Sequence, residues 1–302
     1  MTLTELRYIV ALAREKHFGR AAEKCFVSQP TLSVAVKKLE DELGVILFER
    51  GQHEISVTPQ GEAIIRQAEK VLAEAAHIKE LAAAANDPLA GPLSIGAIYT
   101  IGPYLLPKLV PLLRARAPQM PLLLQENFTA KLLEALKNGE LDVAIVALPI
   151  EESGLVAQPV YDEVFRVLTP AQHPWAKEKV IAPRRLLEEP LLLLGRGNCF
   201  RDQVLDLCAR AGAGGPQVLE GSSLETIRLM VASGIGVTVM PASAVDGLPK
   251  NDALLRVKPF TEPTPSRRVG LVWRASFPRH QAIDLLRQAL IDCKLPGATP
   301  VK

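Results

Sequence analysis

Apolar residues recur at helical spacing through most of the first forty-four residues. Residues 3–18 and 19–25 predict two helices, and residues 31–44 predict a third. The third helix is expected to bury one apolar face, made of Leu32, Val36, Leu39 and Leu43. Ser28 is suited to cap this helix, and Gly44 is suited to end it.

A strand pair is predicted after the three helices. Residues 47–50 and 55–59 are expected to form two strands around the polar turn 51–54. Two helices joined by a tight turn and followed by such a hairpin are typical of a winged helix-turn-helix. The pattern therefore predicts a DNA-binding domain over residues 1–58.

A long helix is predicted from Pro59 to Ala85, capped by Thr58 and ended by the sequence NDP. Apolar residues recur along it at alternating four- and three-residue steps, at Ile64, Ala68, Val71, Ala75, Ile78, Ala82 and Ala85. This spacing favours a dimerising linker over residues 59–87. A helix face packed against its own domain gives the same pattern.

From Gly91 onward, short apolar strands alternate with helices. The order β-α-β-α-β over residues 93–148 is repeated in a second series between residues 164 and 241. Such alternation predicts an α/β fold, with a parallel sheet and helices on both faces. Ligands of such sheets bind at the carboxyl ends of the strands, which is where we expect a binding site.

Composition narrows the function classes. The 302 residues are 48% hydrophobic and 23% charged, with a formal net charge of +2, which is ordinary for a soluble globular protein. Charged residues interrupt the early apolar run, and no stretch has the roughly 18 apolar residues of a membrane span. We therefore expect a cytoplasmic protein without a membrane partner. The scattered histidines and the absence of CxxC spacing predict no metal site, and no cofactor is expected.

Acidic and basic residues are balanced up to Thr58, so DNA affinity has to come from segregation of charge. The residues expected to face DNA lie at the start of the third helix and in the wing, and they are Gln29, Pro30, Thr31, Ser33, Lys37 and Arg50. A solvated helix face would show the same polar pattern.

The first sixty residues resemble the winged helix-turn-helix of LysR-type transcriptional regulators. The resemblance rests on the elements A-A-E, V-S-Q-P-x-L-S, L-E-x-E-L-G, L-F-x-R and T-P-x-G-E, which follow one another almost without gaps over residues 3–62. It implies binding to promoter DNA and a linker helix that dimerises.

The same resemblance implies a regulatory domain over residues 88–302, similar in fold to periplasmic solute-binding proteins. Its chain returns to the first lobe near the end. This places lobe I at residues 88–161 and 267–302, and lobe II at residues 162–266.

Two cysteines, Cys199 and Cys208, flank a segment at 200–210 that predicts a helix. Nine helical residues separate them by some 13 Å on nearly opposite faces, whereas a disulfide needs Cα atoms within roughly 4.4–6.8 Å. Either the two thiols are unrelated, or the helix has to come apart. The helix start and the nearby Arg196 and Arg201 favour a thiolate at Cys199.

The other cysteines and two threonines have simple alternative explanations. Cys208 could simply be a small residue buried in the core, and Cys25 and Cys293 could be inert structural thiols. Thr100 follows the first strand and Thr129 follows the second, so both are expected at the crevice that Cys199 enters from the second lobe. Each threonine alone also fits a cap or a turn.

Four segments narrow the resemblance to the OxyR-type hydrogen-peroxide sensors within the LysR family. They are AIYTIGPYLLP, ENFT, LLLLGRGNCFRDQVLDLC and PSRRVGLVW. The resemblance implies that Cys199 is the peroxidatic cysteine and Cys208 the resolving cysteine. It implies a peroxide pocket that contains Thr100, Thr129, Asn198, Asp202 and Arg267.

The resemblance further implies an activator of oxidative-stress genes rather than an enzyme. Such a protein switches through a reversible Cys199–Cys208 disulfide, forms dimers and tetramers, and contacts RNA polymerase. Asn198 departs from the pattern, because many members have a histidine there, and an amide cannot move a proton. A LysR-type regulator that senses a small metabolite remains an alternative, and so does a thiol peroxidase, which the DNA-binding domain argues against.

Overall fold

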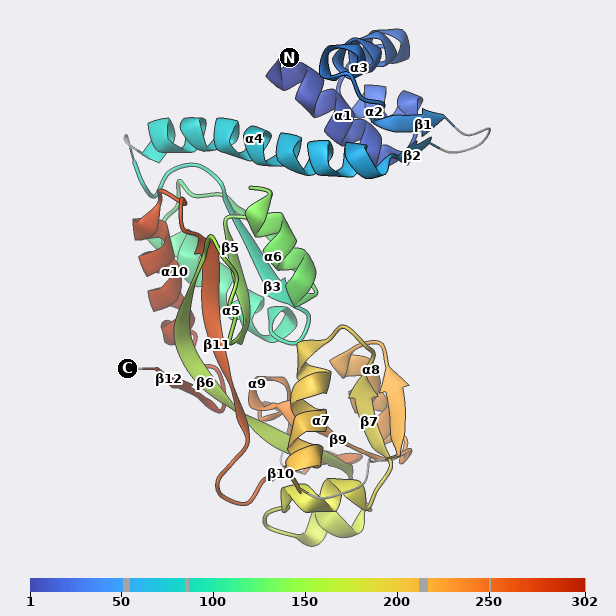
Figure 1. Cartoon of the computed structure of the whole chain (residues 1–302). Helices are drawn as coiled ribbons and strands as arrows, with labels where there is room; N and C mark the ends of the chain where they lie inside the picture. The colour runs from blue at the N-terminus through green and yellow to red at the C-terminus, as the bar shows by residue number, and fades with distance from the viewer. Residues whose placement is uncertain (51–54, 85–86, 212–216, 250, 302) are drawn as a thin grey trace. The chain divides into compact units, whose positions relative to one another are not determined.

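The computed structural model describes residues 1–50, 55–84, 87–211, 217–249 and 251–301 (Figure 1). The chain forms two compact units, one made mainly of residues 1–82 and the other mainly of residues 83–302. Among the described residues, no helix combines the length and the apolar character needed to cross a membrane.

The first unit is a three-helix domain with a strand pair and a long helix. Its elements are α1 Leu3–Glu15, α2 Phe18–Lys24, α3 Gln29–Leu43, β1 Phe48–Arg50, β2 Ile55–Val57 and α4 Pro59–Ala84. The Ser28 hydroxyl accepts a hydrogen bond from the Thr31 amide at 3.3 Å, and Gly44 ends α3 in the left-handed conformation, as predicted. β1 and β2 pair antiparallel. The predicted turn at 51–54 lies outside the described residues.

One predicted core position of α3 is wrong. Leu32, Val36 and Leu39 are buried, but Leu43 is 37% exposed. Leu43 is the last residue of α3 and has no place in the apolar core, because the chain turns away at Gly44 before another element can cover its side chain.

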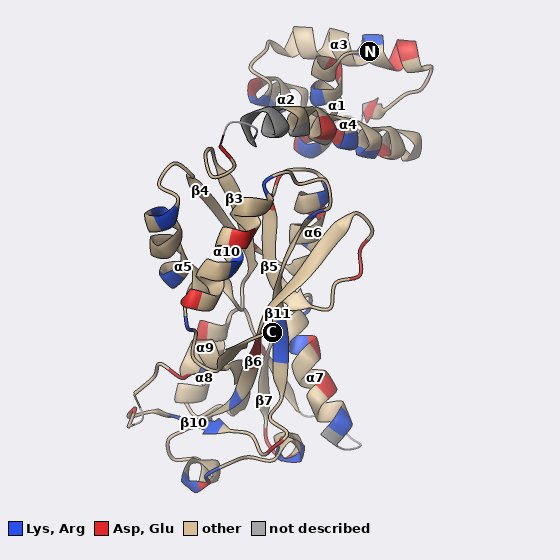
Figure 2. Ribbon diagram, turned by 90° about the vertical axis from the view of Figure 1, so that its left-hand side faces the viewer, with Lys and Arg blue, Asp and Glu red and all other residues tan. Residues whose placement is uncertain are grey.

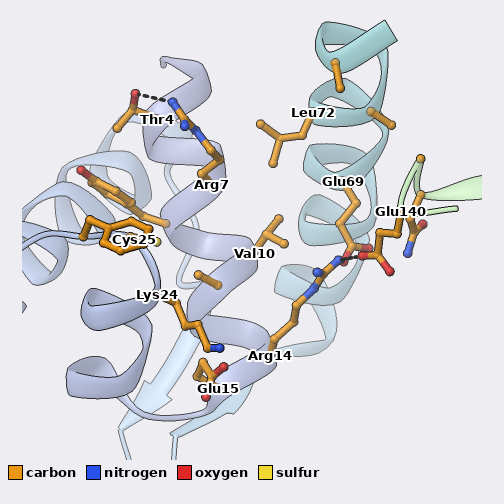
Figure 3. A pocket seen from close by; sticks show the side chains of 17 residues that line it. Thr4, Arg7, Val10, Arg14, Glu15, Lys24, Cys25, Glu69, Leu72 and Glu140 are labelled. Atoms are coloured by element: carbon orange, nitrogen blue, oxygen red, sulfur yellow. Dashed lines mark hydrogen bonds and ion pairs between the residues drawn. The ribbon is translucent and has the colours of Figure 1, made fainter. Parts of the chain in front are cut away.

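The long helix α4 starts at the predicted cap, where the Thr58 hydroxyl accepts a hydrogen bond from the Gly61 amide at 2.9 Å. Its first turns pack on the domain: Ala68 is buried in the core of the first unit, and Arg14 of α1 donates to Glu69 at 3.1 Å (Figure 3). Further along the predicted seam, Val71 is 37% exposed and Ile78 is 68% exposed. Ala85 lies outside the described residues, and dimerisation through this helix stays a prediction.

The second unit is built on a mixed sheet. Its strands are β3 Leu93–Ile98, β4 Leu122–Asn127, β5 Val143–Leu148, β6 Leu155–Pro170, β7 Leu191–Leu194, β8 Val218–Gly221, β9 Val237–Pro241, β10 Leu255–Pro259, β11 Ser266–Arg274 and β12 Ala298–Pro300. The main hydrogen-bonded order is β4-β3-β5-β11-β6-β9-β7-β8, and β10 and β12 also pair with β6.

Strand direction confirms part of the predicted sheet and corrects the rest. β3 is parallel to β4 and β5, and β7 is parallel to β8 and β9. β11, however, runs antiparallel to β5 and β6, and β6 runs antiparallel to β9. The prediction of a parallel sheet is therefore wrong for β6 and β11. These long strands lie between the two parallel groups and join them into one sheet.

Two separate apolar clusters divide this unit into lobes. We call the lobe around β3, β5 and β11 lobe I, and the lobe around β7 and β9 lobe II; β6 contributes Val160 to the first core and Val167 to the second. The strands β3 and β5 carry almost no charge, whereas lysine, arginine, aspartate and glutamate lie mostly on helices and loops (Figure 2). The predicted boundaries between the lobes stay a prediction.

Helices cover both lobes. In lobe I, α5 Gly102–Arg116 and α10 His280–Asp292 lie side by side, and α6 Thr129–Lys137 lies on the other side of the strands (Figure 1). Lobe II has α7 Cys199–Ala211, α8 Leu224–Ala232 and the short α9 Ala242–Val245. The sequence did not predict the short elements α9, β10, β12 and the 3₁₀ turns at Pro174–Lys177 and Pro183–Leu187.

Candidate functional site

A small cavity lies where three strand ends meet. Thr100 follows β3, Thr129 follows β4 at the start of α6, and Cys199 follows β7 as the first residue of α7. All three line the cavity, together with Ile98, Tyr99, Asn127, Phe128, Gly197 and Asn198. It offers about 10 Å³ to the centre of a water-sized molecule, roughly what a single water needs. The predicted convergence of these strand ends is confirmed.

Cys199 lies in polar surroundings at the start of a helix. Its side chain is half-buried, and the Thr129 hydroxyl donates a hydrogen bond to its Sγ at 3.8 Å. The dipole of a helix N-terminus favours a negative charge at this position. Two arginines, Arg196 and Arg201, were expected to favour a thiolate at Cys199. Arg196 is exposed, whereas the Arg201 guanidinium donates to the Leu194 carbonyl oxygen at 2.8 Å and pairs with Glu220 at 2.9 Å.

Cys208 lies in apolar surroundings in the same helix. It is 1% exposed and belongs to the core of lobe II with Phe200 and Val204, whereas Cys199 packs against the core of lobe I. Burial raises the pKa of the Cys208 thiol. α7 is continuous from Cys199 to Ala211, so nine residues of helical rise separate the thiols by some 13 Å. The predictions of a helix here and of apolar packing around Cys208 are confirmed.

A buried arginine joins the cavity to the sheet. The Arg267 side chain donates from Nη1 to the Thr100 hydroxyl at 2.8 Å and from Nη2 to the Thr100 carbonyl oxygen at 3.0 Å. It pairs with Glu163 at 2.7 Å, and both side chains are 0% exposed. The guanidinium also lies over the Phe200 ring, 5.4 Å from its centroid. Arg267 thus reaches the cavity through Thr100 rather than lining it.

The remaining predicted pocket residues are placed differently. Asn198 lines the cavity, and its amide Nδ2 donates to Gly195 O at 2.9 Å. Asp202 is exposed on the first turn of α7 and is not among the residues that line the cavity. Sequence analysis missed Glu163, because its partner Arg267 is 104 residues away in the chain and no local motif marks it.

The predicted DNA-facing residues lie mostly at the surface of α3. Gln29, Pro30, Thr31 and Lys37 are exposed, and Ser33 is half-buried. The neighbouring Lys38 is paired with Glu5 at 3.3 Å. The backbone of Arg50 lies in β1, and its side chain lies outside what the structure describes. Within the described ranges, no group of histidine, cysteine and acidic residues has the arrangement of a metal site.

Family comparisons match both units. Residues 3–62 match the family described as "Bacterial regulatory helix-turn-helix protein, lysR family". Residues 86–293 match the family described as "LysR substrate binding domain".

Individual proteins match nearly the whole chain. The chain is 41% identical over 290 residues to the Escherichia coli K12 DNA-binding transcriptional dual regulator OxyR, covering 96% of this chain and 95% of that protein. It is similar to the structure of a full-length Pseudomonas aeruginosa OxyR that carries a cysteine-to-aspartate substitution, with 54% identity, a TM-score of 0.82 and coverage of 100% and 99%. A hydrogen peroxide-bound cysteine-to-serine mutant of Corynebacterium glutamicum OxyR is 37% identical, with a TM-score of 0.66 and coverage of 97% and 92%.

Proposed function

The chain belongs to the LysR family of transcriptional regulators and is an OxyR-like, redox-sensing homologue of the hydrogen peroxide-inducible gene activators; from this premise we propose that hydrogen peroxide switches it through Cys199 and Cys208. The single observation that carries the proposal is the Cys199 site. A half-buried thiol at a helix N-terminus, with a hydroxyl donor 3.8 Å from its Sγ, borders a cavity of one-water size.

The proposed chemistry has two steps. The Cys199 thiolate attacks one oxygen of hydrogen peroxide, the O–O bond breaks, and the leaving hydroxide takes a proton to become water. The product is a sulfenic acid at Cys199. The Cys208 thiol then condenses with it, releasing a second water and forming the disulfide. Reduction by a cellular thiol, of the kind present in the cytoplasm, restores the starting state.

Cavity size favours peroxide over a metabolite. A space of about 10 Å³ for a water-sized centre suits one very small polar molecule, whereas drug-sized ligands occupy clefts of roughly 300–1,000 Å³. Asn198 in this cavity holds a backbone carbonyl rather than a thiol. We therefore assign the activation of Cys199 to the helix N-terminus and Thr129, without a histidine base.

The disulfide provides the conformational signal. Its sulfurs cannot meet while α7 is intact, so bond formation has to unwind the helix and pull Cys208 from the core of lobe II. Shifting a two-state equilibrium from 1:99 to 99:1 takes about 5.5 kcal/mol. For a two-electron couple this corresponds to a difference in potential on the order of 120 mV.

The partners follow from the family and the exposed surfaces. α3 and the wing would bind promoter DNA, and the exposed Val71 and Ile78 of α4 would pair with a second chain. Tetramers built from such dimers and contact with RNA polymerase complete the proposal, and all of it takes place in the cytoplasm.

The direct test is the mass of the oxidised protein. After brief exposure of the reduced full chain to hydrogen peroxide, digestion and mass spectrometry should find one Cys199–Cys208 cross-linked peptide pair, with Cys25 and Cys293 still reduced. A chain that retains four free thiols would overturn the proposal, and it would favour a metabolite sensor with incidental cysteines. Sustained removal of peroxide beyond one equivalent, with a thiol reductant supplied, would favour a thiol peroxidase.

A further inference from the structure

The two threonines of the cavity have opposite hydrogen-bonding roles. The Thr100 hydroxyl accepts a hydrogen bond from Arg267, and an arginine side chain has no acceptor to offer in return. The hydroxyl proton of Thr100 is therefore free to donate into the cavity. The Thr129 hydroxyl donates its proton to the Cys199 sulfur, so only its lone pairs remain for a cavity occupant.

A buried carboxylate fixes this arrangement. Glu163 Oε2 accepts from Arg267 Nε at 2.8 Å and pairs with Nη2 at 2.7 Å, while Oε1 accepts from the Ser243 amide at 3.0 Å. Both carboxylate oxygens are thus engaged. Glu163 compensates the buried guanidinium charge and holds it in the one orientation that presents Nη1 to the Thr100 hydroxyl and Nη2 to the Thr100 carbonyl.

We propose that Glu163 is a positioning residue for the peroxide reaction, holding Arg267 so that the Thr100 hydroxyl donates to the leaving oxygen. This rests on the proposed function. The Cys199 sulfur forms a bond with the near oxygen, whose own proton is accepted by Thr129 in a hydrogen bond and stays on the sulfenic acid. The O–O electron pair passes to the far oxygen. Thr100, polarised by the Arg267 charge, donates a hydrogen bond to that oxygen as negative charge develops on it. The departing hydroxide takes its proton from solvent.

The hydrogen-bonding pattern of this cavity matches the substrate. One donor and one acceptor suit a molecule with an O–H on one oxygen and an accepting lone pair on the next. Hydrogen peroxide has this pattern.

A double-mutant cycle separates positioning from a purely structural role. Oxidation of Cys199 by hydrogen peroxide is followed in the full chain by rapid mixing. Removing one donor to a developing oxyanion costs about a hundredfold or more in rate, so Thr100→Val should slow oxidation about a hundredfold. Glu163→Gln should slow it about tenfold. Because Glu163 acts through Thr100, the double variant should be no slower than Thr100→Val alone.

The sheet supplies a matched control. Asp162 and Arg268 form the neighbouring pair on the same two strands, with both contacts at 2.8 Å. Their side chains are 39% and 50% exposed, and neither contacts Thr100 in the described structure. Asp162→Asn should leave the oxidation rate unchanged. Thr100→Ser, which keeps the hydroxyl, should restore most of the rate lost in Thr100→Val. Alkylation of Cys199 by iodoacetamide, which has no oxygen leaving group, should differ by less than about threefold among all these variants.

The outcomes are distinct. The positioning role would be overturned if Glu163→Gln oxidised at the wild-type rate, or if alkylation of Cys199 slowed as much as its oxidation. It would also be overturned if the double variant oxidised about tenfold more slowly than Thr100→Val. If Glu163→Gln does not fold, Glu163→Asp, which keeps the charge on a shorter arm, takes its place in the same cycle. A wild-type chain that forms no Cys199–Cys208 disulfide would defeat the proposed function instead.

Discussion

The two ends of α7 carry the same side chain in opposite surroundings. At its first residue, Cys199 is half-buried, packs on the core of lobe I and accepts a hydrogen bond from Thr129. Nine residues on, Cys208 is 1% exposed in the core of lobe II. Burial raises the pKa of Cys208, which keeps that thiol protonated near neutral pH.

In the proposed function, this difference divides the chemistry between the two thiols. The accessible Cys199 can meet a small oxidant, whereas the buried Cys208 is protected from it. The continuous helix α7 keeps the two thiols apart in this structure, and we propose that it unwinds only after Cys199 has reacted. The cost of bringing them together is the burial of one small side chain and a few helical hydrogen bonds, about a few kcal/mol.

Removing the reactive end should have the largest effect. Cys199→Ser should abolish the transcriptional response to hydrogen peroxide, because serine cannot form the sulfenic acid. Binding to operator DNA should persist, since α3 belongs to the other unit. A reporter assay with and without peroxide, and a gel-shift assay, measure the two properties. A normal peroxide response in this variant would refute the division of roles.

A second buried thiol, Cys293, offers a further test of how burial changes the pKa of a cysteine in this protein. Burial raises the pKa of Cys293, which is 8% exposed, from 9.0 to about 11. Its stabilising contribution is complete below the unfolded pKa near 9 and is lost as the pH rises towards 11, because the unfolded thiol ionises first. At about 1.4 kcal/mol per unit, it accounts for up to about 3 kcal/mol of the free energy of unfolding.

Denaturation of the reduced protein at pH 8 and pH 11 measures this loss. Cys293→Ala should fall less in stability between the two pH values than the wild type does. Cys208→Ala should change the slope in the same direction, because burial also raises the pKa of that thiol. A slope equal to that of the wild type in both variants would mean that neither thiol is buried as described.

Removing the hydroxyl beside Cys199 should have an intermediate effect. Thr129→Val keeps the shape of the side chain but loses the donor to the sulfur, and it should slow sulfenic acid formation about tenfold, as expected for a lost hydrogen bond to a charged group. Thr129→Ser serves as the control and should oxidise at nearly the wild-type rate. Unaltered kinetics in Thr129→Val would leave Thr129 as a simple helix-start residue.

A change in the DNA-binding unit should have the smallest effect and leave both ends of α7 untouched. Lys37 is exposed on α3, so Lys37→Ala should reduce the slope of log affinity against log salt by about 1. Fluorescence anisotropy at several salt concentrations measures this. Cys199 oxidation should keep its wild-type rate. An unchanged salt slope would mean that Lys37 is only solvated.

Local patterns were sufficient to predict much of the fold. Ser28 and Gly44 mark the ends of α3 because capping and left-handed glycine are decided within a few residues. Thr100 and Thr129 lie together because the parallel strands β3 and β4 end at the same edge, and Cys199 meets them because β7 of lobe II runs in the opposite direction to β3. Leu43 was predicted incorrectly because periodicity cannot tell whether the last turn of a helix is covered.

Pairing between residues far apart in the chain could not be predicted from local sequence patterns. β6 runs for 16 residues between two cores, and only its partners show that it is one strand. Glu163 lies inside it, among alternating residues that mark no site. Its importance depends on its ion pair with Arg267 of β11 and on the hydrogen bond from Arg267 to the Thr100 hydroxyl. Both are tertiary contacts between residues far apart in the chain. Asp202, by contrast, was named from resemblance, and in this structure it faces solvent.

Hydrogen exchange along α7 measures directly whether the disulfide unwinds this helix. Backbone amides of residues 200–211 are compared in the reduced protein and in protein whose Cys199–Cys208 bond has been verified by mass. Oxidation should speed the exchange of amides across α7, while the amides of β3 in lobe I stay protected. Unchanged protection of α7 in the verified disulfide form would contradict this unwinding.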